Sequence, residues 1–427
     1  MSSGGVLRLL ACLGRHTICR FWRFRLLFRQ VSRLVHRGDG YNRTAMKKLA
    51  SAIVLCLFLT SALLWVQLPK WRGAQNPEAV LNQLVQDALS AMTLDQKIAA
   101  LFMVRPEELG DLTAPGDHLE ENYSSYPVSG VIFFAKNLID AEQTKEYIAD
   151  MQLLSGIPLL IATDQEGGRI SRFSPETFDV PVLPSMYEIG QSGRPERAYE
   201  AMKATGESLK ALGFNVDFAP VADIWSNPLN TVIGDRAFAS TADGVAPFVR
   251  QAVRGLEDAS IASCVKHFPG HGETEADTHA GTAVSNVDAR TLRERELGPF
   301  AAGIEEGCPM VMVAHIKLPN VTGDDLPASL SPAIVQGILR DEMGFEGVVI
   351  TDSLQMGAVT EFFSPEEAPV MALKAGCDIL LMPEDLPRAF NGIKAAVEAG
   401  QITESRIDES VLRILKLRLK YGVAAEQ

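Results

Sequence analysis

The sequence predicts an α/β protein: a (β/α)8 barrel of the TIM type, preceded by an N-terminal transmembrane or signal segment. Three observations predict it. Short and almost continuously apolar runs alternate with longer amphipathic stretches, which is typical of parallel strands separated by helices. Polar residues follow these runs where they end, and no charged residue lies between Leu49 and Pro69. A doubly wound sheet is the alternative fold, because two of the eight runs are weak.

The first 72 residues differ in charge from the rest of the chain. They carry thirteen basic residues against a single acid, Asp39, although the net charge of all 427 residues is −13. Lys47 and Lys48 precede the apolar run, so the positive-inside rule places the N-terminus in the cytoplasm and the remainder outside. Small residues that could form a cleavage site lie inside the apolar run, which favours an uncleaved signal anchor over a signal peptide.

These features divide the chain into four expected parts. Met46 resembles a natural start, so the basic residues before it are either a genuine extension or the product of an over-long gene assignment. The parts are 1–45, a basic extension whose translation is open; 46–72, a signal anchor or signal peptide; 73–90, a linker and lead-in helix; and 91–425, the (β/α)8 domain.

The strands and helices of the domain follow one another in regular order. Thr93 is placed to cap a first helix, and Gln96 three residues later completes a capping box. The expected strands are Ile98–Val104, Val131–Phe134, Leu159–Thr163, Val216–Pro220, Ile261–Lys266, Met310–Ala314, Val348–Thr351 and Ile379–Met382. The helical patterns between them include Ala141–Leu154, Pro195–Leu212, Val245–Ala259, Arg290–Glu306 and Pro332–Met343. Eight such units match a (β/α)8 barrel with long loops.

Polar residues that could take part in catalysis follow the third to the seventh expected strands. They are Asp164 and Glu166, Asp223, Lys266 and His267, His315, and Asp352. In a (β/α)8 barrel the residues that carry chemistry lie where the strands end, at the carboxyl face. One such residue would mean little, but five strands with such residues in register predict one shared pocket.

Charge and cysteine content exclude some classes of function. The acidic body excludes nucleic acid as a partner, because it offers no positive surface to a phosphate backbone. Of the six cysteines, only Cys264, Cys308 and Cys377 follow the leading segment, each beside an apolar run. We expect buried free thiols there rather than disulfides. Nothing in the sequence indicates an oligomer, and we expect a monomer.

The segment KHFPGHGETEADTHAG, from Lys266 to Gly281, holds three of the seven histidines and raises the question of a metal site. His267 and His271 are four residues apart, but the Phe-Pro-Gly between them forbids a helix, so they do not share a helix face. No pair of cysteines lies nearby. We therefore expect no metal and no cofactor, and we interpret His271 as part of a solvated polar loop.

Asp277 and His279, in the same segment, form a different pattern. A carboxylate two residues before an imidazole can accept a hydrogen bond from one ring nitrogen and raise the basicity of the other. This pairing suits general acid–base catalysis. The pattern is weak when it stands alone, and its value depends on the residues around it.

Asp352 closes the apolar run that begins at Gly347. A carboxylate in that position is costly to bury unless it is paired or hydrogen-bonded. It is either the N-cap of the segment that follows or a nucleophile at the mouth of the barrel. Lys266, Arg172 and Arg236 would keep the pKa of such a nucleophile low.

Six motifs follow one another between about residues 90 and 385: MTLDQK, DQEGGRISRF, VDFAPVADI, GDRAFAS, KHFPGHGETEADTH and GVVITDSLQMGAV. Together they resemble glycoside hydrolase family 3. Within it, they are similar to the single-domain bacterial β-N-acetylhexosaminidases that act on peptidoglycan fragments. The resemblance implies a retaining β-glycosidase on a (β/α)8 barrel.

The resemblance also implies a role for each matching residue. Asp352 would be the nucleophile that forms a glycosyl-enzyme intermediate. His279 would be the general acid/base, with Asp277 as its orienting partner. The residues that would bind the sugar are Asp164, Arg172, Arg236, Lys266 and His267.

The activity that the resemblance implies is exo-cleavage of terminal, non-reducing β-linked N-acetylglucosamine. The carbohydrate substrate would come from muropeptides or chitooligosaccharides. With the predicted anchor, we expect the enzyme on the periplasmic face of the bacterial inner membrane, in contact with the membrane through its N-terminal segment. A β-N-acetylglucosaminide phosphorylase, a β-glucosidase of the same family and a non-catalytic wall-binding protein remain as alternatives.

Overall fold

The computed structural model describes residues 77–274, 281 and 283–422. By its internal contacts the chain divides into two compact units, Met1–Val80 and Leu81–Gln427. The first unit is described only from residue 77 on, as the start of a helix. The predicted membrane segment at Leu49–Pro69 lies outside the described residues. Within the residues that are described, no helix combines the length and the apolar character needed to span a membrane.

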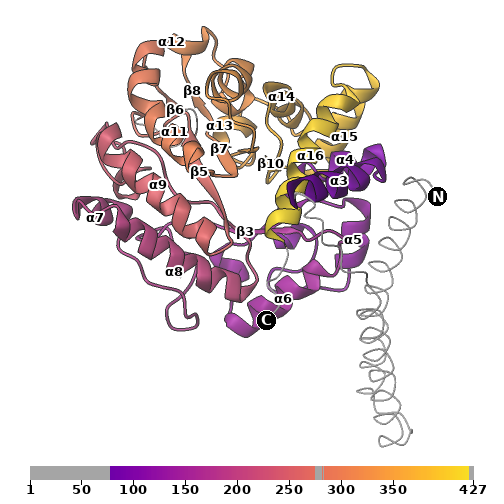
Figure 1. Ribbon diagram of the computed structural model, residues 1–427. Helices are drawn as coiled ribbons and strands as arrows, with labels where there is room; N and C mark the ends of the chain where they lie inside the picture. Colours follow the sequence, from indigo (N-terminus) through magenta and orange to yellow (C-terminus); the bar gives the residue numbers. More distant parts are fainter. Residues whose placement is uncertain (1–76, 275–280, 282, 423–427) are drawn as a thin grey trace, which may run out of the picture. The chain divides into compact units, whose positions relative to one another are not determined.

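Eight parallel strands form a nearly closed barrel (Figure 1). In chain order they are β1 (Phe102–Val104), β2 (Gly130–Ile132), β3 (Leu160–Thr163), β4 (Val216–Asp217), β5 (Ala262–Phe268), β7 (Met310–Val313), β9 (Val348–Thr351) and β10 (Leu380–Leu381). Each strand pairs with the next, and β1 pairs with β10 through Phe102 and Leu380. A bridge between Ile350 and Ile379 joins β9 to β10. Because the sheet returns to its first strand, the doubly wound alternative is excluded.

Helices connect the strands and cover their outer side, where α8, α9 and α11 lie next to one another (Figure 1). The α-helices are α3 (Pro77–Ser90), α4 (Leu94–Ala99), α5 (Leu119–Ser125), α6 (Ala141–Gln152), α7 (Met186–Gln191), α8 (Glu196–Leu212), α9 (Ala242–Asp258), α10 (Ala289–Thr291), α11 (Leu297–Glu305), α12 (Pro319–Thr322), α13 (Gly357–Thr360), α14 (Glu367–Ala375), α15 (Leu386–Glu398) and α16 (Glu404–Tyr421).

Tighter and wider helical turns and a small second sheet complete the structure. The 3-10 turns are η1 (Pro106–Glu108), η2 (Ala135–Asn137), η3 (Gly234–Arg236) and η5 (Ala328–Leu330). Two segments are π-helical, η4 (Leu292–Glu296) and η6 (Ala333–Glu342). The second sheet pairs β6 (Ala283–Val284) with β8 (Ile316–Lys317).

The strands are apolar because both of their faces are buried. Every residue of β1, β3, β5, β7 and β9 is buried. The covering helices bury one face only; on α9 this face includes Val245, Val249 and Val253. Burying one such side chain stabilises the fold by about 1.5–3 kcal/mol. The prediction of buried free thiols is confirmed for the three cysteines of the described chain: Cys264, Cys308 and Cys377.

The predicted strands match the observed ones with one main difference. The run Ile98–Val104 was predicted as strand, but its first two residues are the end of α4, and only Phe102–Val104 is strand. The predicted capping box is confirmed. The Thr93 hydroxyl accepts from the backbone N–H of Gln96, and the Gln96 side chain accepts from the backbone N–H of Thr93. The last turn of α4 contains the apolar residues Ile98 and Ala99, which would suit a strand equally well.

Candidate functional site

Polar side chains gather at the carboxyl ends of five neighbouring strands. The residues and their strands are Asp164 and Glu166 after β3, Asp223 after β4, Lys266 and His267 on β5, His315 after β7, and Asp352 after β9. Hydrogen bonds and ion pairs join the residues of β3, β4 and β5 across the strands, and Nε2 of His315 lies within hydrogen-bond distance of the carbonyl of Ser353, next to Asp352. These contacts bring the strand-end residues into one cluster, whereas the shared pocket and the role of each residue stay predictions.

Lys266 lies at the centre of an ion-pair cluster. Its Nζ lies 2.8 Å from Oδ1 of Asp164 and 2.7 Å from Oε1 of Glu166. Arg172 Nη2 donates to the second oxygen of Asp164, Oδ2, at 3.0 Å. Arg236 donates to both oxygens of Glu166, Nε to Oε2 and Nη2 to Oε1, each at 2.8 Å. Three cations thus surround two carboxylates, and the bonds are of the strong, charge-assisted kind.

These contacts set the charge of each member. Burial alone would raise the pKa of Asp164, but Lys266 and Arg172 outweigh it, and the pKa falls below its usual range. Burial likewise opposes ionisation of Glu166, and Arg236 and Lys266 lower its pKa. Burial lowers the pKa of Lys266, but Asp164 and Glu166 raise it overall. All these groups are therefore charged at neutral pH, and they act as fixed donors and acceptors rather than as proton carriers.

Asp223, which is fully buried, orients the histidine segment that ends β5. Its Oδ2 lies 2.6 Å from Nδ1 of His267 and accepts from the His267 backbone N–H at 3.2 Å. Its Oδ1 accepts from the backbone N–H of His271 at 2.6 Å. Arg236 Nη2 lies 3.1 Å from Nε2 of His267, and because a guanidinium can only donate, Nε2 is the acceptor. His267 therefore carries its proton on Nδ1 and donates it to Asp223.

Asp352 is held at the end of β9 by its own backbone and by its neighbours. Its backbone N–H donates to the carbonyl of Val313 on β7 at 2.9 Å. Its Oδ1 accepts from the backbone N–H of Ser353 at 2.7 Å. Burial would raise the pKa of Asp352, but the nearby imidazoles of His267 and His315 and the bond from Ser353 lower it. The carboxylate is therefore ionised at neutral pH, as a nucleophile must be.

His315 links β7 to the segment that carries Asp352. Its Nε2 lies 2.9 Å from the carbonyl of Ser353, and because a carbonyl only accepts, Nε2 carries a proton. Its Nδ1 lies 2.6 Å from the hydroxyl of Ser329. The alternative interpretation of Asp352 as an N-cap is wrong, because the next helix, α13, has Met356 at its N-cap.

Two buried acids near this cluster were not singled out from the sequence. Asp217, on β4, accepts from the backbone N–H of Gln165 at 2.9 Å, and in the described part of the chain its Oδ2 has no hydrogen-bond partner. Burial raises the pKa of Asp217 well above its usual range. Glu296, in η4, pairs with Arg295 at 2.6 Å, yet burial raises its pKa to about 7. The sequence signal for Asp217 is an acid between the apolar residues Val216 and Phe218 of a strand. The signal for Glu296 is weaker, an acid directly before Leu297.

The structure brings six of the predicted site residues together at the strand ends: Asp164, Arg172, Arg236, Lys266, His267 and Asp352. Asp277 and His279 lie outside the described residues. The interpretation of His271 as part of a solvated loop is wrong. It is buried, its Nδ1 lies 2.8 Å from the hydroxyl of Thr274, and Asp223 holds its backbone.

Three residues of the site received no role from the sequence, although each follows a strand: Glu166, Asp223 and His315. Within the described ranges, no three His, Cys, Asp or Glu side chains are grouped as a metal ion requires. What the site offers is an ionised carboxylate beside a rigid set of charged donors and acceptors. Such a site can hold a ligand rich in hydroxyl groups and attack it with the carboxylate.

Comparison with known proteins identifies relatives over most of the chain. The family model described as the glycosyl hydrolase family 3 N terminal domain matches residues 93–417. The chain is similar to beta-hexosaminidase A of Pseudoalteromonas piscicida, 35% identical over 338 residues, which is 72% of this chain and 56% of that protein. It is also similar to a beta-hexosaminidase of Hydrogenovibrio crunogenus, 37% identical over 298 residues, 68% of this chain and 82% of that protein.

Solved structures give a consistent result. The chain is similar to a glycoside hydrolase family 3 beta-N-acetylglucosaminidase from Paenibacillus sp. str. FPU-7, with a TM-score of 0.75 and 40% sequence identity. The alignment covers 79% of this chain and 64% of that one. The chain thus spans somewhat more than half the length of this structure and of the Pseudoalteromonas relative.

Proposed function

The chain belongs to glycosyl hydrolase family 3, and on that premise we propose that it is a retaining exo-β-N-acetylglucosaminidase. The bond cleaved would join a terminal, non-reducing N-acetylglucosamine to the rest of a glycan. Two curated relatives carry the name beta-hexosaminidase, which agrees with the class of enzyme that the sequence predicts. Because the chain spans only 56% of the first of them, its own activity and substrate are proposals.

The observation that carries the proposal is an ionised Asp352 beside a rigid charged cluster. A pyranose presents several hydroxyl groups that both donate and accept hydrogen bonds. Asp164 supplies an acceptor, and Arg172 and Lys266 supply donors, all fixed by mutual bonds of 2.8–3.0 Å. Such a cluster does not need to reorganise when the sugar binds, so its binding energy can be used to orient the anomeric carbon toward Asp352.

The reaction would proceed in two steps with overall retention of configuration. In the first, a carboxylate oxygen of Asp352 attacks the anomeric carbon, the bond from that carbon to the leaving oxygen breaks, and His279 gives its proton to that oxygen. In the second, water attacks the same carbon, His279 takes the proton of the water, and Asp352 is released. The assignment of His279 and Asp277 rests on the motif ADTH in the sequence.

We propose peptidoglycan fragments or chitooligosaccharides as substrates, met outside the cytoplasmic membrane by a monomer. The support for that location is the uncharged run Leu49–Pro69 behind Lys47 and Lys48. The support for the substrate class is the family and the names of its relatives.

Asp352→Asn tests the proposal most directly. The amide keeps the shape of the carboxyl but cannot form the glycosyl-enzyme. We expect the kcat of the full chain on an aryl β-N-acetylglucosaminide to fall about a thousandfold or more. Asp243→Asn, which changes an exposed acid on α9, should keep the rate of the unmodified chain. Turnover by Asp352→Asn at the unmodified rate would remove Asp352 from the mechanism.

The same assay separates the alternatives. Faster release from an aryl β-glucoside than from the N-acetylglucosaminide would favour a β-glucosidase. Formation of N-acetylglucosamine 1-phosphate in phosphate buffer would favour a phosphorylase, because phosphate would then replace water in the second step. Binding of chitooligosaccharides without turnover of any of these substrates would favour a non-catalytic wall-binding protein.

A further inference from the structure

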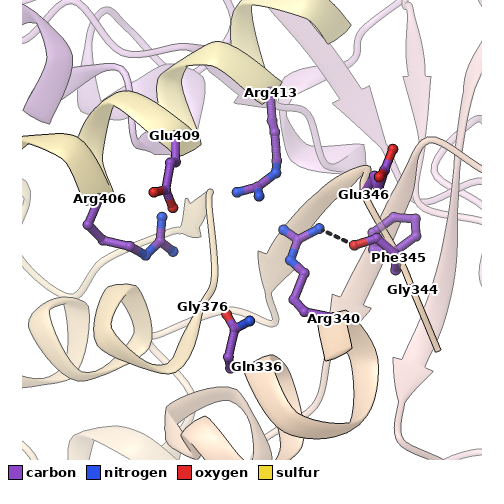
Figure 2. Close-up of a pocket in the computed structure, with 9 residues that line it drawn as sticks. All are labelled: Gln336, Arg340, Gly344, Phe345, Glu346, Gly376, Arg406, Glu409 and Arg413. Carbon is purple, nitrogen blue, oxygen red and sulfur yellow. Dashed lines mark hydrogen bonds between the residues drawn. The ribbon is translucent and has the colours of Figure 1, made fainter. Parts of the chain in front are cut away.

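A polar cavity lies at the end of the barrel where the strands begin, opposite the candidate active site. Its volume is about 270 Å³, and it is lined by residues of η6, of the turn after η6, and of α16 (Figure 2). Behind it lies Asp378, which accepts from the backbone N–H of Val349 at 3.0 Å, near the start of β9. Asp352 follows the other end of the same strand, so this cavity is separate from the candidate active site.

Three arginines from two elements converge on this one buried carboxylate. Arg340 Nη2 donates to Oδ2 of Asp378 at 2.5 Å, and Arg413 Nη1 donates to Oδ1 at 3.1 Å. Arg406 Nη1 lies 3.9 Å from the same Oδ1, and the Ser410 hydroxyl also donates to Oδ1. Both carboxylate oxygens of Asp378 therefore accept hydrogen bonds already. Its single negative charge faces the positive charges of three arginines.

The excess of positive charge acts on the pKa of Arg340. Burial lowers the pKa of Arg340, Asp378 opposes that change, and the charge of Arg413 lowers the pKa further. The two guanidinium groups are thus close enough to repel each other, and Asp378, which binds both of them, offsets part of this repulsion. A second anion in the cavity would offset more of it.

The arginines keep hydrogen-bond donors that protein groups do not use. In the residues that the structure describes, Arg413 makes a hydrogen bond only through Nη1, which leaves its Nε and Nη2 available. Arg340 donates through Nη1 to the carbonyls of Phe345 and Gly347 and through Nη2 to Asp378, which leaves its Nε. Figure 2 shows the guanidinium groups of Arg340 and Arg413 facing each other across the cavity.

We propose that this cavity binds an oxyanion of the phosphate class between Arg340 and Arg413. Nε and Nη2 of Arg413 form a fork that matches two oxygens of a phosphate group, and Nε of Arg340 adds a third donor. A phosphate would also balance the excess of the three arginines over the buried Asp378. The volume of about 270 Å³ is larger than a free phosphate needs, so the cavity also admits a phosphate ester with a small substituent.

Two exposed acids at the rim, Glu346 and Glu409, modulate the site. Figure 2 shows the carboxylate of Glu409 on the same side of the cavity as Arg406. Because both acids are solvated, their charges are partly screened and weaken the attraction for an anion without cancelling it. Removing one of them should therefore tighten binding.

The test is isothermal titration of the full chain with inorganic phosphate and, in a second arm, with glycerol phosphate, at constant ionic strength. We expect one site per chain that N-acetylglucosamine does not displace. Arg413→Gln should weaken binding about tenfold or more, because it removes a charge-assisted contact. Glu409→Gln should tighten it about two- to fivefold.

Arg290→Gln is the matched control, because it removes an exposed arginine on α10, away from the cavity, and should leave the affinity unchanged. Tighter binding of the ester than of inorganic phosphate would assign the site to esterified phosphate, and the reverse order to the free ion. Circular dichroism and turnover of the aryl substrate verify that Arg413→Gln is folded. If neither ligand binds, or if binding survives Arg413→Gln, the cavity is not an oxyanion site.

Discussion

Burial acts in opposite directions on the acids of this barrel, depending on the cations within reach. Asp164 is buried against Lys266 and Arg172, and its pKa is lowered. Glu296 is buried with one partly exposed arginine, Arg295, and its pKa is raised to about 7. The difference follows from the balance of desolvation and charge. The acids of the candidate site are therefore kept ionised, whereas Glu296 beside it is half protonated near neutral pH.

The raised pKa of Glu296 predicts a stability effect with a defined sign. Below the ordinary pKa of 4.5 the carboxyl is protonated in both the folded and the unfolded chain. Between 4.5 and about 7 the unfolded chain ionises first, so the stability of the fold decreases as the pH rises. Glu296→Gln cannot ionise and should therefore be more stable than the unmodified chain at about pH 8, by at most about 3 kcal/mol, and equally stable at about pH 4.

Urea denaturation of both proteins at these two pH values measures the difference. Glu294→Gln, an exposed change on the same segment, should alter stability by less than about 0.5 kcal/mol at either pH. An advantage of Glu296→Gln that is the same at both pH values would show that packing, not ionisation, is responsible.

At the scale of elements, the segments after β4 and β5 are locked together by a close backbone approach. The backbone N–H of Asn227 donates to the carbonyl of Gly272. A Cβ atom at Gly272 would lie 1.7 Å from the carbonyl oxygen of Ile224, so no larger residue fits without displacing backbone. The same stretch of chain contains Asp223, which orients His267. The approach of these two segments thus positions part of the candidate site.

Gly272→Ala should therefore reduce both stability and turnover. Forcing a methyl group into this contact should destabilise the chain by about 1–3 kcal/mol and shift Asp223 relative to His267. Thermal unfolding and the kcat on the aryl substrate report the two effects. Gly156→Ala, where no atom lies within 4 Å of the added Cβ, should change neither. Equal behaviour of the two variants would mean that the segment adapts without cost.

The elements that the sequence predicts best are those with a local cause. The eight strands were predictable because burial on both faces demands apolar runs, and the start of α4 because Thr93 and Gln96 form a local capping box. The clustering of Asp164, Lys266 and Asp352 followed from strand topology. The burial of His271 and the charge state of Glu296 depend on neighbours distant in sequence, such as Asp223, and no local pattern encodes them.

The π-helical form of η6 was likewise not predictable, since a helix was expected over Pro332–Met343 and the pattern does not distinguish the two forms.

At the scale of the whole molecule, the fold of the barrel brings the last described helix back to the start of the third strand. Helix α16 packs near the start of β3, about 260 residues earlier, and the joining residue is Arg418. The sheet itself returns to its first strand through β10, and the Arg418 contact ties the last helix to the opposite side of the barrel.

Replacing Arg418 tests how much this contact contributes to the stability of the fold. It is 4% exposed, and it donates to the carbonyls of Pro158 at 2.9 Å and Ile157 at 2.7 Å and to the hydroxyl of Ser155 at 2.9 Å. Arg418→Met keeps the length of the side chain but leaves these acceptors without their donor, so we expect a loss of about 3 kcal/mol in the free energy of unfolding.

The kcat per folded molecule should remain unchanged, because Pro158 precedes β3 and lies at the opposite end of that strand from Asp164. Urea denaturation and active-site titration at 25 °C measure the two quantities separately. Arg290→Met, which breaks an exposed ion pair with Glu294, is the control and should cost less than about 0.5 kcal/mol. A fall in kcat without a change in unfolding would instead mean that α16 acts on the site through β3, and that closure of the barrel and organisation of its carboxyl face are coupled.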